Sequence, residues 1–433
     1  MGNEIGQDKN LSNPVRRVLI ASLIGTTIEF FDFYIYSTAA VLVFPKLFFP
    51  ASDPTSATLQ SLATFALAFF ARPIGAALFG HFGDRIGRKA TLVAALLTMG
   101  PSTVAIGLLP TYASIGVFAP ILLALFRFGQ GLGLGGEWGG AVLLAMENAP
   151  KKKKAWYGMF PQLGAPVGFV LSSGTFLLLS STLSDSQFFA FGWRIPFIAS
   201  SLLVWVGLYV RLRLTETPDF LRVVERKERV KLPMMVIFAK HTRTLILGTF
   251  VAVTTFVLFY LMTVFTLSWG TSALHFQRSG FLIAQLVAVL FFAVSIPVSA
   301  VWADRHGRSI TLIFATIAIL LFGFFFPVLF RAGDWISTSI FLALGMVLMG
   351  FTYGPLGTSL AEIFPASVRY TGSSLSFTIA GIIGASLAPY LAMDLAKSYG
   401  LSYVGYYLSI ASALTLLALL LSRRSQRAAE GRD

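Results

Sequence analysis

Long, continuous apolar runs follow one another along nearly the whole chain. A helix needs about 20 apolar residues to span a bilayer, where only helices and closed barrels satisfy all their backbone polar groups. Because the runs do not alternate between polar and apolar residues, they favour helices over barrel strands. We therefore predict an all-α membrane protein with twelve transmembrane helices, at 18–44, 57–82, 90–110, 115–147, 155–180, 193–213, 243–269, 280–303, 309–330, 335–361, 371–396 and 402–422.

The composition agrees with lipid as the main solvent. Hydrophobic residues make up 56% of the 433 residues and charged residues only 12%, which leaves more apolar surface than a soluble core can hide. The absence of cysteine excludes disulfides, thiolate metal sites and a cysteine nucleophile. The polar start, Met1 to Pro14, precedes an apolar run that is long enough to stay in the membrane, so no cleavable signal peptide is predicted.

Basic residues account for the net charge of +14 and gather in alternate loops. This bias marks the cytoplasmic side of a membrane protein and predicts that both termini are cytoplasmic. It also argues against a basic patch for nucleic acid. The cytoplasmic set is Lys9, Arg16, Arg17, Arg85, Arg88, Lys89, Lys151 to Lys154, the basic residues from Arg211 to Arg243, Arg305, Arg308, Arg369, Arg423, Arg424, Arg427 and Arg432, and the opposite set is Lys46, Arg194, Arg278, Arg331 and Lys397.

A charged loop occurs twice in the chain. Gly-Asp-Arg-Ile-Gly-Arg at Gly83 to Arg88 returns 220 residues later as Ala-Asp-Arg-His-Gly-Arg at Ala303 to Arg308. A second motif, Glu147-x-x-Pro150-x-x-x-Lys154, returns 215 residues later as Glu362-x-x-Pro365-x-x-x-Arg369. Two motifs repeated in the same order with nearly equal offsets indicate an internal duplication.

The duplication divides the chain into two predicted bundles of six helices. The N-terminal bundle is expected over 1–213 and the C-terminal bundle, with a short cytoplasmic tail, over 243–433. The cytoplasmic linker between them, 214–242, alternates in charge. Such a segment forms either an amphipathic helix on the membrane surface or a plain tether, and both interpretations stay open.

The first charged loop, Gly80-x-x-Gly83-Asp84-Arg85-x-Gly87-Arg88-Lys89, resembles the signature of the major facilitator superfamily. In the second copy, Ala303 replaces the loop glycine and Ser309 replaces the second basic residue, so we expect a weaker network there. Further motifs resemble those of the metabolite:proton symporter branch: Glu29-Phe-Phe-Asp32-Phe-Tyr34, Arg72-Pro73-x-Gly75, Arg127-x-x-Gln130-Gly131, Gly135-Gly136-Glu137, Gly192-Trp193-Arg194 and Glu216-Thr217-Pro218-x-Phe220.

This resemblance implies a function and a fold. Members of the branch import shikimate, α-ketoglutarate, citrate and related carboxylates, or proline and betaine, with protons. The resemblance thus implies a proton-coupled symporter of a bacterial inner membrane, built from two pseudo-symmetric six-helix bundles that work by alternating access. It implies no cofactor beyond the proton gradient, and we expect a monomer. The resemblance does not choose between an organic acid and a zwitterionic solute.

Ionisable residues inside the predicted membrane helices are the candidates for coupling, since such groups are costly in lipid and usually functional. Glu29 and Asp32 are three residues apart and share one helix face, with Tyr36 one turn beyond. Arg127 lies at a similar depth. We predict that Asp32 carries the proton, with Glu29 as the secondary carrier, and that Arg127 alternates between this acid and the substrate. A permanent Asp32–Arg127 ion pair that orients two helices is the alternative.

Arg72 and Glu137 form a second candidate group at matching depth, nearer the cytoplasmic side. They are expected either to form a buried structural pair or, for Arg72, to bind substrate. Polar and aromatic residues at mid-depth are further candidates for the cavity wall. They are Gln162, Tyr260 and Tyr353, with Ser374 and Ser376 as weaker candidates, although such groups also join helices to each other.

The charged loops are expected to act as a cytoplasmic latch. Asp84 and Arg88 are placed to reach Glu147, and Arg308 to reach Glu362. Arg85 and Asp304 complete the two copies of this gating network. A purely topological role, in which arginines hold the loops inside the cell, is compatible with the same residues.

Two functions other than symport are compatible with the sequence. A proton-driven antiporter that exports drugs or metabolites and a non-transporting solute sensor are the alternatives. An enzyme is not expected, because the spans contain no Ser-His-Asp set, metal cluster or nucleotide loop. The glycines from Gly129 to Gly140 are predicted to serve close helix packing and not phosphate binding, because no Gly-Lys-Ser/Thr ending follows them.

Overall fold

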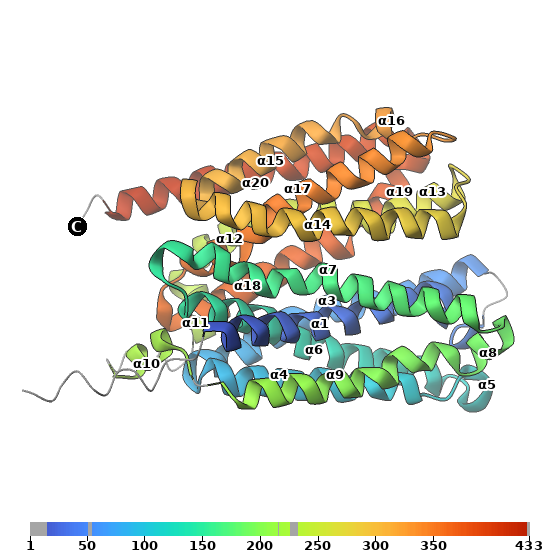
Figure 1. The fold of residues 1–433 in the computed structure, drawn as a ribbon, viewed down its shortest axis with the longest axis horizontal. Helices are drawn as coiled ribbons and strands as arrows, with labels where there is room; N and C mark the ends of the chain where they lie inside the picture. Colours follow the sequence, from blue (N-terminus) through green and yellow to red (C-terminus); the bar gives the residue numbers. More distant parts are fainter. Residues whose placement is uncertain (1–14, 51–53, 215, 226–232, 431–433) are drawn as a thin grey trace, which may run out of the picture. The chain divides into compact units, whose positions relative to one another are not determined.

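The structure is a computed structural model that describes residues 15–50, 54–214, 216–225 and 233–430. These residues fold almost entirely into helices, and no strand occurs among them (Figure 1). The chain forms two compact units. Unit 1 comprises Met1–Ile237 and Pro365–Ser374, and unit 2 comprises Phe238–Phe364 and Leu375–Asp433. The predicted cytoplasmic termini include 1–14 and 431–433, which lie outside the described residues.

Unit 1 contains six long helices joined by short turns and short helices. The pairs α1 with α7, α3 with α6, and α4 with both α6 and α9 pack along their lengths (Figure 1). The long helices are α1 (Val15–Leu42), α3 (Pro54–Arg85), α4 (Arg88–Leu108), α6 (Phe118–Glu147), α7 (Lys154–Thr182) and α9 (Ile195–Leu212), and the short elements are α2 (Phe44–Leu47), α5 (Tyr112–Ile115), η1 (Lys151–Lys153), α8 (Asp185–Ala190), η2 (Gly192–Arg194), α10 (Pro218–Glu225) and η4 (Ala366–Val368). Helix α11 (Pro233–Lys240) begins in unit 1 and ends in unit 2.

Unit 2 contains two helices that are interrupted by a π-helical turn. In one, η3 lies between α12 and α13, and in the other η5 lies between α18 and α19. Helix α18 begins in unit 1 and continues in unit 2. The elements are α12 (Thr242–Tyr260), η3 (Leu261–Phe265), α13 (Thr266–Ser272), α14 (Arg278–His306), α15 (Arg308–Gly323), α16 (Phe326–Leu329), α17 (Trp335–Glu362), α18 (Arg369–Gly381), η5 (Ile382–Ser386), α19 (Ala388–Tyr399) and α20 (Leu401–Glu430).

Eleven helical stretches among the described residues are long and apolar enough to cross a membrane. The remaining predicted span, 309–330, is divided into the 16-residue α15 and the short α16. Pro327 lies at the start of α16 and has no N–H to donate to the carbonyl of Gly323, four residues earlier, which is the last residue of α15. The count of twelve spans and the cytoplasmic termini remain predictions.

The glycine-rich part of α6 allows α3 to approach closely. A Cβ added at Gly135 would lie 2.1 Å from the carbonyl oxygen of Arg72, and one added at Gly75 would lie 2.0 Å from that of Leu132. Any side chain at these positions would therefore push the two helices apart. This geometry supports the packing role predicted for the glycines.

The predicted linker over 214–242 contains α10 and α11, and 215 and 226–232 within it lie outside the described residues. Helix α10 contacts η4 inside unit 1. At least this part of the linker is a packed element of unit 1.

Candidate functional site

Every charged side chain that is buried among the described residues lies in unit 1. Such groups are costly in a membrane and are commonly found at functional sites. They come from five helices that are far apart in the sequence: Glu29 and Asp32 on α1, Arg72 and Asp84 on α3, Arg88 on α4, Arg127, Glu137 and Glu147 on α6, and Arg211 on α9.

Asp32 is fully buried and its carboxylate accepts two hydroxyl hydrogen bonds. Ser200 Oγ on α9 donates to Oδ1 at 2.5 Å, and Thr103 Oγ1 on α4 donates to Oδ2 at 2.9 Å. Both oxygens of the carboxylate are thereby oriented by neighbouring helices. Sequence reasoning missed Ser200 and Thr103, because a hydroxyl in an apolar helix carries no signal that separates a functional contact from ordinary helix packing.

Arg127 is linked to Asp32 through a chain of hydrogen bonds. Its Nη1 donates to Gln130 Oε1, and Gln130 Nε2 donates to Thr103 Oγ1 at 2.8 Å and to the backbone oxygen of Asp32 at 3.2 Å. The guanidinium carbon of Arg127 also lies 3.9 Å from the ring centroid of Tyr36. Gln130 and Thr103 therefore connect the two ionisable groups.

Tyr36 lies beside this chain and is fully buried. Its hydroxyl hydrogen-bonds Thr64 Oγ1 on α3 at 2.8 Å. The ring thus covers the Arg127 guanidinium while the hydroxyl is held by another helix. These two contacts hold the Tyr36 ring in place against Arg127.

Arg72 and Glu29 are two further buried charges of unit 1, and each has polar atoms without a hydrogen bond among the described residues. Arg72 is 6% exposed, and its Nε and Nη2 have no hydrogen-bond partner among the described residues. Its guanidinium carbon lies 4.6 Å from the Phe33 ring centroid and 5.4 Å from that of Phe69. Glu29 Oε2 also lacks a hydrogen-bond partner in the described part of the chain. Arg72 thus has unused donors and Glu29 an unused acceptor.

The structure gives Glu137 a different partner from the predicted Arg72. Arg211 Nη1 and Nη2 bind its two carboxylate oxygens at 2.7 and 2.5 Å, and Arg211 Nη1 also donates to the Leu92 carbonyl at 2.6 Å. Arg72 makes no ion pair among the described residues, so the predicted Arg72–Glu137 pair is wrong for this structure. The sequence grouped Arg211 with the loop charges, but its side chain enters the bundle past Gly25, where an added Cβ would lie 2.5 Å from Arg211 Nη2.

The first charged loop forms a buried network with Glu147. Arg88 lies 3.5 Å from both Asp84 and Glu147. Asp84 also accepts backbone hydrogen bonds from Tyr370 and Thr371 at 3.3 and 3.1 Å, which caps the start of α18 within unit 1. Arg369 contributes a further contact to Glu147 at 3.5 Å. Segment 365–374 is thus bound to the loop and to the end of α6.

Glu216, from the motif that follows α9, caps the N-terminus of α4. Its Oε1 accepts the N–H of Arg88 at 2.9 Å, and its Oε2 accepts that of Lys89 at 3.3 Å. The adjacent Thr217 Oγ1 donates to Glu147 Oε2 at 2.6 Å. In the sequence this motif stands out only through the family resemblance, whereas in the structure it binds the charged loop directly.

The remaining candidates are placed as follows. Arg85 is exposed beside His81, at 3.3 Å, and not in the buried network. In unit 2, Arg308 pairs with Glu362, and these side chains are 23% and 26% exposed. Asp304 of the second loop is partly exposed.

The cavity-wall candidates lie in separate units. Gln162 in unit 1 accepts a hydrogen bond from Trp138 Nε1 at 2.8 Å. Tyr260 and Tyr353 are buried in unit 2, where their rings contact Phe259 and Phe292. Within the described ranges, no group of three or more His, Cys, Asp or Glu could hold a metal ion.

Comparison with known proteins adds an independent line of evidence. The family described as sugar (and other) transporter matches residues 17–234. The chain is 58% identical over 419 residues to the inner membrane metabolite transport protein YhjE of Escherichia coli (strain K12), covering 96% of this chain and 95% of that protein.

Two further relatives have named solutes. The chain is 35% identical to the shikimate transporter of Escherichia coli (strain K12), covering 95% of each protein, and 34% identical to the proline/betaine transporter of Salmonella typhimurium, covering 93% of this chain and 82% of that protein. Among solved structures, the proton:xylose symporter XylE bound to 6-bromo-6-deoxy-D-glucose aligns with a TM-score of 0.74 at 17% identity over 95% of both chains, which shows a common fold.

Proposed function

The chain belongs to the major facilitator superfamily and is a metabolite transporter, not an enzyme, and we propose that it is a proton-coupled symporter that imports a small organic acid or zwitterionic metabolite. It is a protein of a bacterial inner membrane, like its relative that is named an inner membrane metabolite transport protein. The proton gradient supplies the energy and no cofactor takes part. The working unit is a monomer.

The observation that carries this proposal is the surroundings of Asp32. This fully buried acid is bound by Ser200 and Thr103 and joined to Arg127 through Gln130. A carboxylate in such a place can exchange a proton, while the hydroxyls reorient to bond either protonation state. Arg127 responds to that exchange through the same chain. Glu29, one turn earlier on α1, is the secondary proton carrier.

The unused donors of Arg72 favour a solute that bears a carboxylate. Its buried guanidinium, with Nε and Nη2 unused, offers the geometry that binds a carboxylate through two parallel hydrogen bonds. Shikimate, proline and betaine, the solutes named for two relatives, each carry one carboxylate. Arg127, Tyr36 and Gln162 from unit 1, and Tyr260 and Tyr353 from unit 2, complete the proposed binding residues.

The proposed mechanism is alternating access. The proposed architecture has twelve spans and cytoplasmic termini, with bundles at 1–213 and 243–433 that the linker 214–242 joins. Proton and solute must favour the same state, since a ligand shifts an equilibrium only by its differential affinity. Segment 365–374 belongs by sequence to the C-terminal bundle and by its contacts to unit 1. This supports a latch role for the gating residues Asp84, Arg85, Arg88, Glu147, Asp304, Arg308 and Glu362.

Uptake into proteoliposomes tests the proposal. A thermal-shift screen of organic acids, amino acids and betaines first identifies a ligand, because binding stabilises the native state. An inward proton gradient should then drive accumulation of that ligand. Asp32→Asn should abolish accumulation against a gradient, while Asp185→Asn, at an exposed position of the same unit, should retain it.

Other outcomes would identify a different function. Uphill transport by Asp32→Asn at the parental level would refute the assignment of Asp32. Solute efflux driven by proton entry would indicate an antiporter, and binding without accumulation would indicate a sensor. If one proton enters per solute, stimulation by a membrane potential points to a zwitterion, because a monoanion and a proton together carry no net charge.

A further inference from the structure

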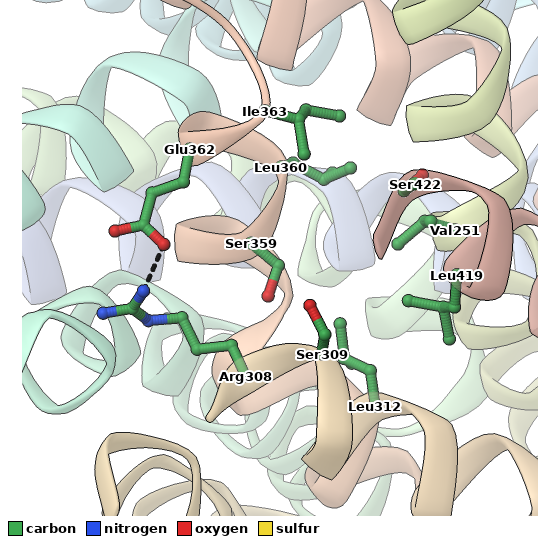
Figure 2. A pocket seen from close by; sticks show the side chains of 10 residues that line it. All are labelled: Val251, Arg308, Ser309, Leu312, Ser359, Leu360, Glu362, Ile363, Leu419 and Ser422. Atoms are coloured by element: carbon green, nitrogen blue, oxygen red, sulfur yellow. Dashed lines mark hydrogen bonds and ion pairs between the residues drawn. The ribbon is translucent and has the colours of Figure 1, made fainter. Parts of the chain in front are cut away.

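Unit 2 contains a cavity of about 150 Å³. Of the proposed transport residues, only the ion pair Arg308–Glu362 lines it, at its edge. It lies where α12, α15, α17 and α20 meet (Figure 2). Liquid water occupies about 30 Å³ per molecule, so the space accommodates several waters or one small polar group. Its lining residues are Val251, Arg308, Ser309, Leu312, Ser359, Leu360, Glu362, Ile363, Leu419 and Ser422.

Several polar atoms of this lining have no partner. Ser359 Oγ, Ser422 Oγ and Arg308 Nε are buried atoms without a hydrogen-bond partner among the described residues. Figure 2 shows the hydroxyls of Ser309 and Ser359 directed toward the same space, from α15 and α17. Buried polar atoms almost always have a partner, either in the protein or in water or a ligand. The lining of the cavity therefore suits a polar occupant.

The N-terminus of α15 lies at this cavity. Its N-cap is Gly307, which provides no side-chain cap, and the first two helical residues, Arg308 and Ser309, line the cavity. The first N–H groups of a helix have no partner within the helix, and they carry the positive end of the helix dipole. Such an end favours an anion.

The corresponding helix end in unit 1 shows which chemistry fits there. By the sequence repeat, Gly87 corresponds to Gly307, and both have positive φ angles, of 119° and 97°. At α4, the Glu216 carboxylate occupies this place, so that a Cβ on Gly87 would lie 2.1 Å from Glu216 Oε2. At α15, a Cβ on Gly307 would meet only Ile310 Cδ1, at 3.9 Å. In unit 1 a carboxylate thus lies against the loop glycine, whereas in the described part of unit 2 no carboxylate lies against Gly307, and the Glu362 carboxylate at the cavity edge pairs with Arg308.

We propose that this cavity binds an oxyanion of the phosphate type, either free phosphate or the phosphate of an anionic lipid headgroup. The N–H groups of Arg308 and Ser309 and the hydroxyls of Ser359 and Ser422 are its donors. Arg423 follows Ser422 in α20 and adds positive charge to this end of the helix.

Glu362 does not exclude an anion from this place. Its carboxylate is paired with Arg308. Unit 1 shows the same combination, because Glu147 pairs with Arg88 while the Glu216 carboxylate binds the N–H of that same arginine. One arginine and a helix N-terminus thus accommodate two carboxylates there.

Thermal unfolding of the purified full-length protein in a neutral detergent tests the site. Sodium phosphate should raise the melting temperature in a saturable way, and sodium chloride at equal ionic strength should not. Short-chain phosphatidylglycerol, compared with diacylglycerol of the same chain length, tests the lipid source. Action of the lipid at lower concentrations than phosphate assigns the site to a headgroup, and the reverse order assigns it to the free anion. Absence of a response to both would overturn the proposal.

Variants separate this site from the solute site. Ser359→Asp should supply an internal carboxylate, as Glu216 does in unit 1, and should remove the phosphate response. Ser272→Asp, at an exposed position of α13, should keep the response. The milder Ser359→Ala/Ser422→Ala variant, which removes two hydroxyls, should weaken phosphate binding at least about fivefold. A full response in both the Ser359→Asp and the double-alanine variants would refute the site.

Discussion

The two units differ in how they satisfy buried polar groups. Unit 1 places all the buried charges of the described residues among its helices, and each of Asp32, Glu137 and Glu147 is held by side chains from other helices. Unit 2 has no buried charge in its described part and uses hydroxyls and amides instead. Proton exchange and recognition of a charged group are therefore expected in unit 1.

Unit 2 also contains both π-helical turns of the described chain. Gln285 on α14 donates to the carbonyl oxygens of Met262 and Thr263, at 3.0 and 2.7 Å, and so binds backbone groups in the turn at Leu261–Phe265. Irregular turns of this kind are frequent at functional sites and hinges. One unit thus contains the buried ionic groups, while the other contains irregular helices that are suited to bending.

Breaking the buried ion pair of unit 1 should have the largest effect on stability. Arg211→Gln leaves Glu137 buried without its partner, and such a loss costs about 3–5 kcal/mol. The matching change in unit 2, Arg308→Gln, affects a partly exposed pair and should cost about 1 kcal/mol or less. Thermal unfolding of both variants in one detergent measures the difference. Equal losses would contradict the difference in burial between the two pairs, and adding Glu137→Gln to Arg211→Gln should restore part of the stability.

Loss of the unpartnered arginine should have the next largest effect, on solute affinity. Arg72→Gln removes a charge-assisted interaction worth about 1.5–3 kcal/mol, which corresponds to roughly a tenfold to hundredfold weaker affinity. Tyr260→Phe in unit 2 removes one neutral hydroxyl and should weaken affinity about fivefold at most. Equilibrium binding of the identified solute measures both. A larger loss of affinity in Tyr260→Phe than in Arg72→Gln would indicate that unit 2 contributes most to binding of the solute.

The two repeated loop glycines offer a sharper comparison. Alanine at Gly87 or Gly307 strains the backbone by about 1–3 kcal/mol, because both have positive φ angles. Gly87→Ala also displaces Glu216 from the end of α4, and loss of such a cap costs about 1 kcal/mol more. We expect Gly87→Ala to be the less stable variant in denaturant titrations. Equal stability would mean that Glu216 contributes little as a cap.

Helix capping should give the smallest difference. Asp334 caps α17 in unit 2, and the hydrogen bond from the Ser337 N–H holds its pKa below the usual value of 3.8. A lowered pKa means that this stabilisation is present above the unfolded-state pKa and is lost as the pH falls through the folded-state pKa. Asp334→Ala should therefore lower the melting temperature slightly and equally between pH 5 and 8. Ser184→Ala, which removes the uncharged cap of α8, should show no dependence at lower pH, and a pH-dependent effect there would contradict this reasoning.

The sequence predicted the helical class and the family, and it singled out several charged residues that the structure buries, but it predicted few of their partners. Glu29, Asp32, Arg72 and Arg127 are conspicuous because they interrupt apolar runs. Ser200 and Thr103 are not, since hydroxyls are common in membrane helices. The structure divides the predicted span over 309–330 into α15 and α16. The apolar pattern of the sequence does not reveal this division, because Pro327 is apolar but ends the hydrogen bonding of α15.

Hydrophobic length by itself determined that this chain forms membrane helices, because each long apolar run acts on lipid independently of the others. The repeated motifs likewise identified the duplication and the charged loops. Only the tertiary structure decided that Arg211 binds Glu137, that Glu216 caps α4 and that the end of α15 has no such cap. These choices depend on how far each helix is rotated and on where a small residue such as Gly25 leaves room for a long side chain. Neither is encoded in the local pattern of apolar and polar residues.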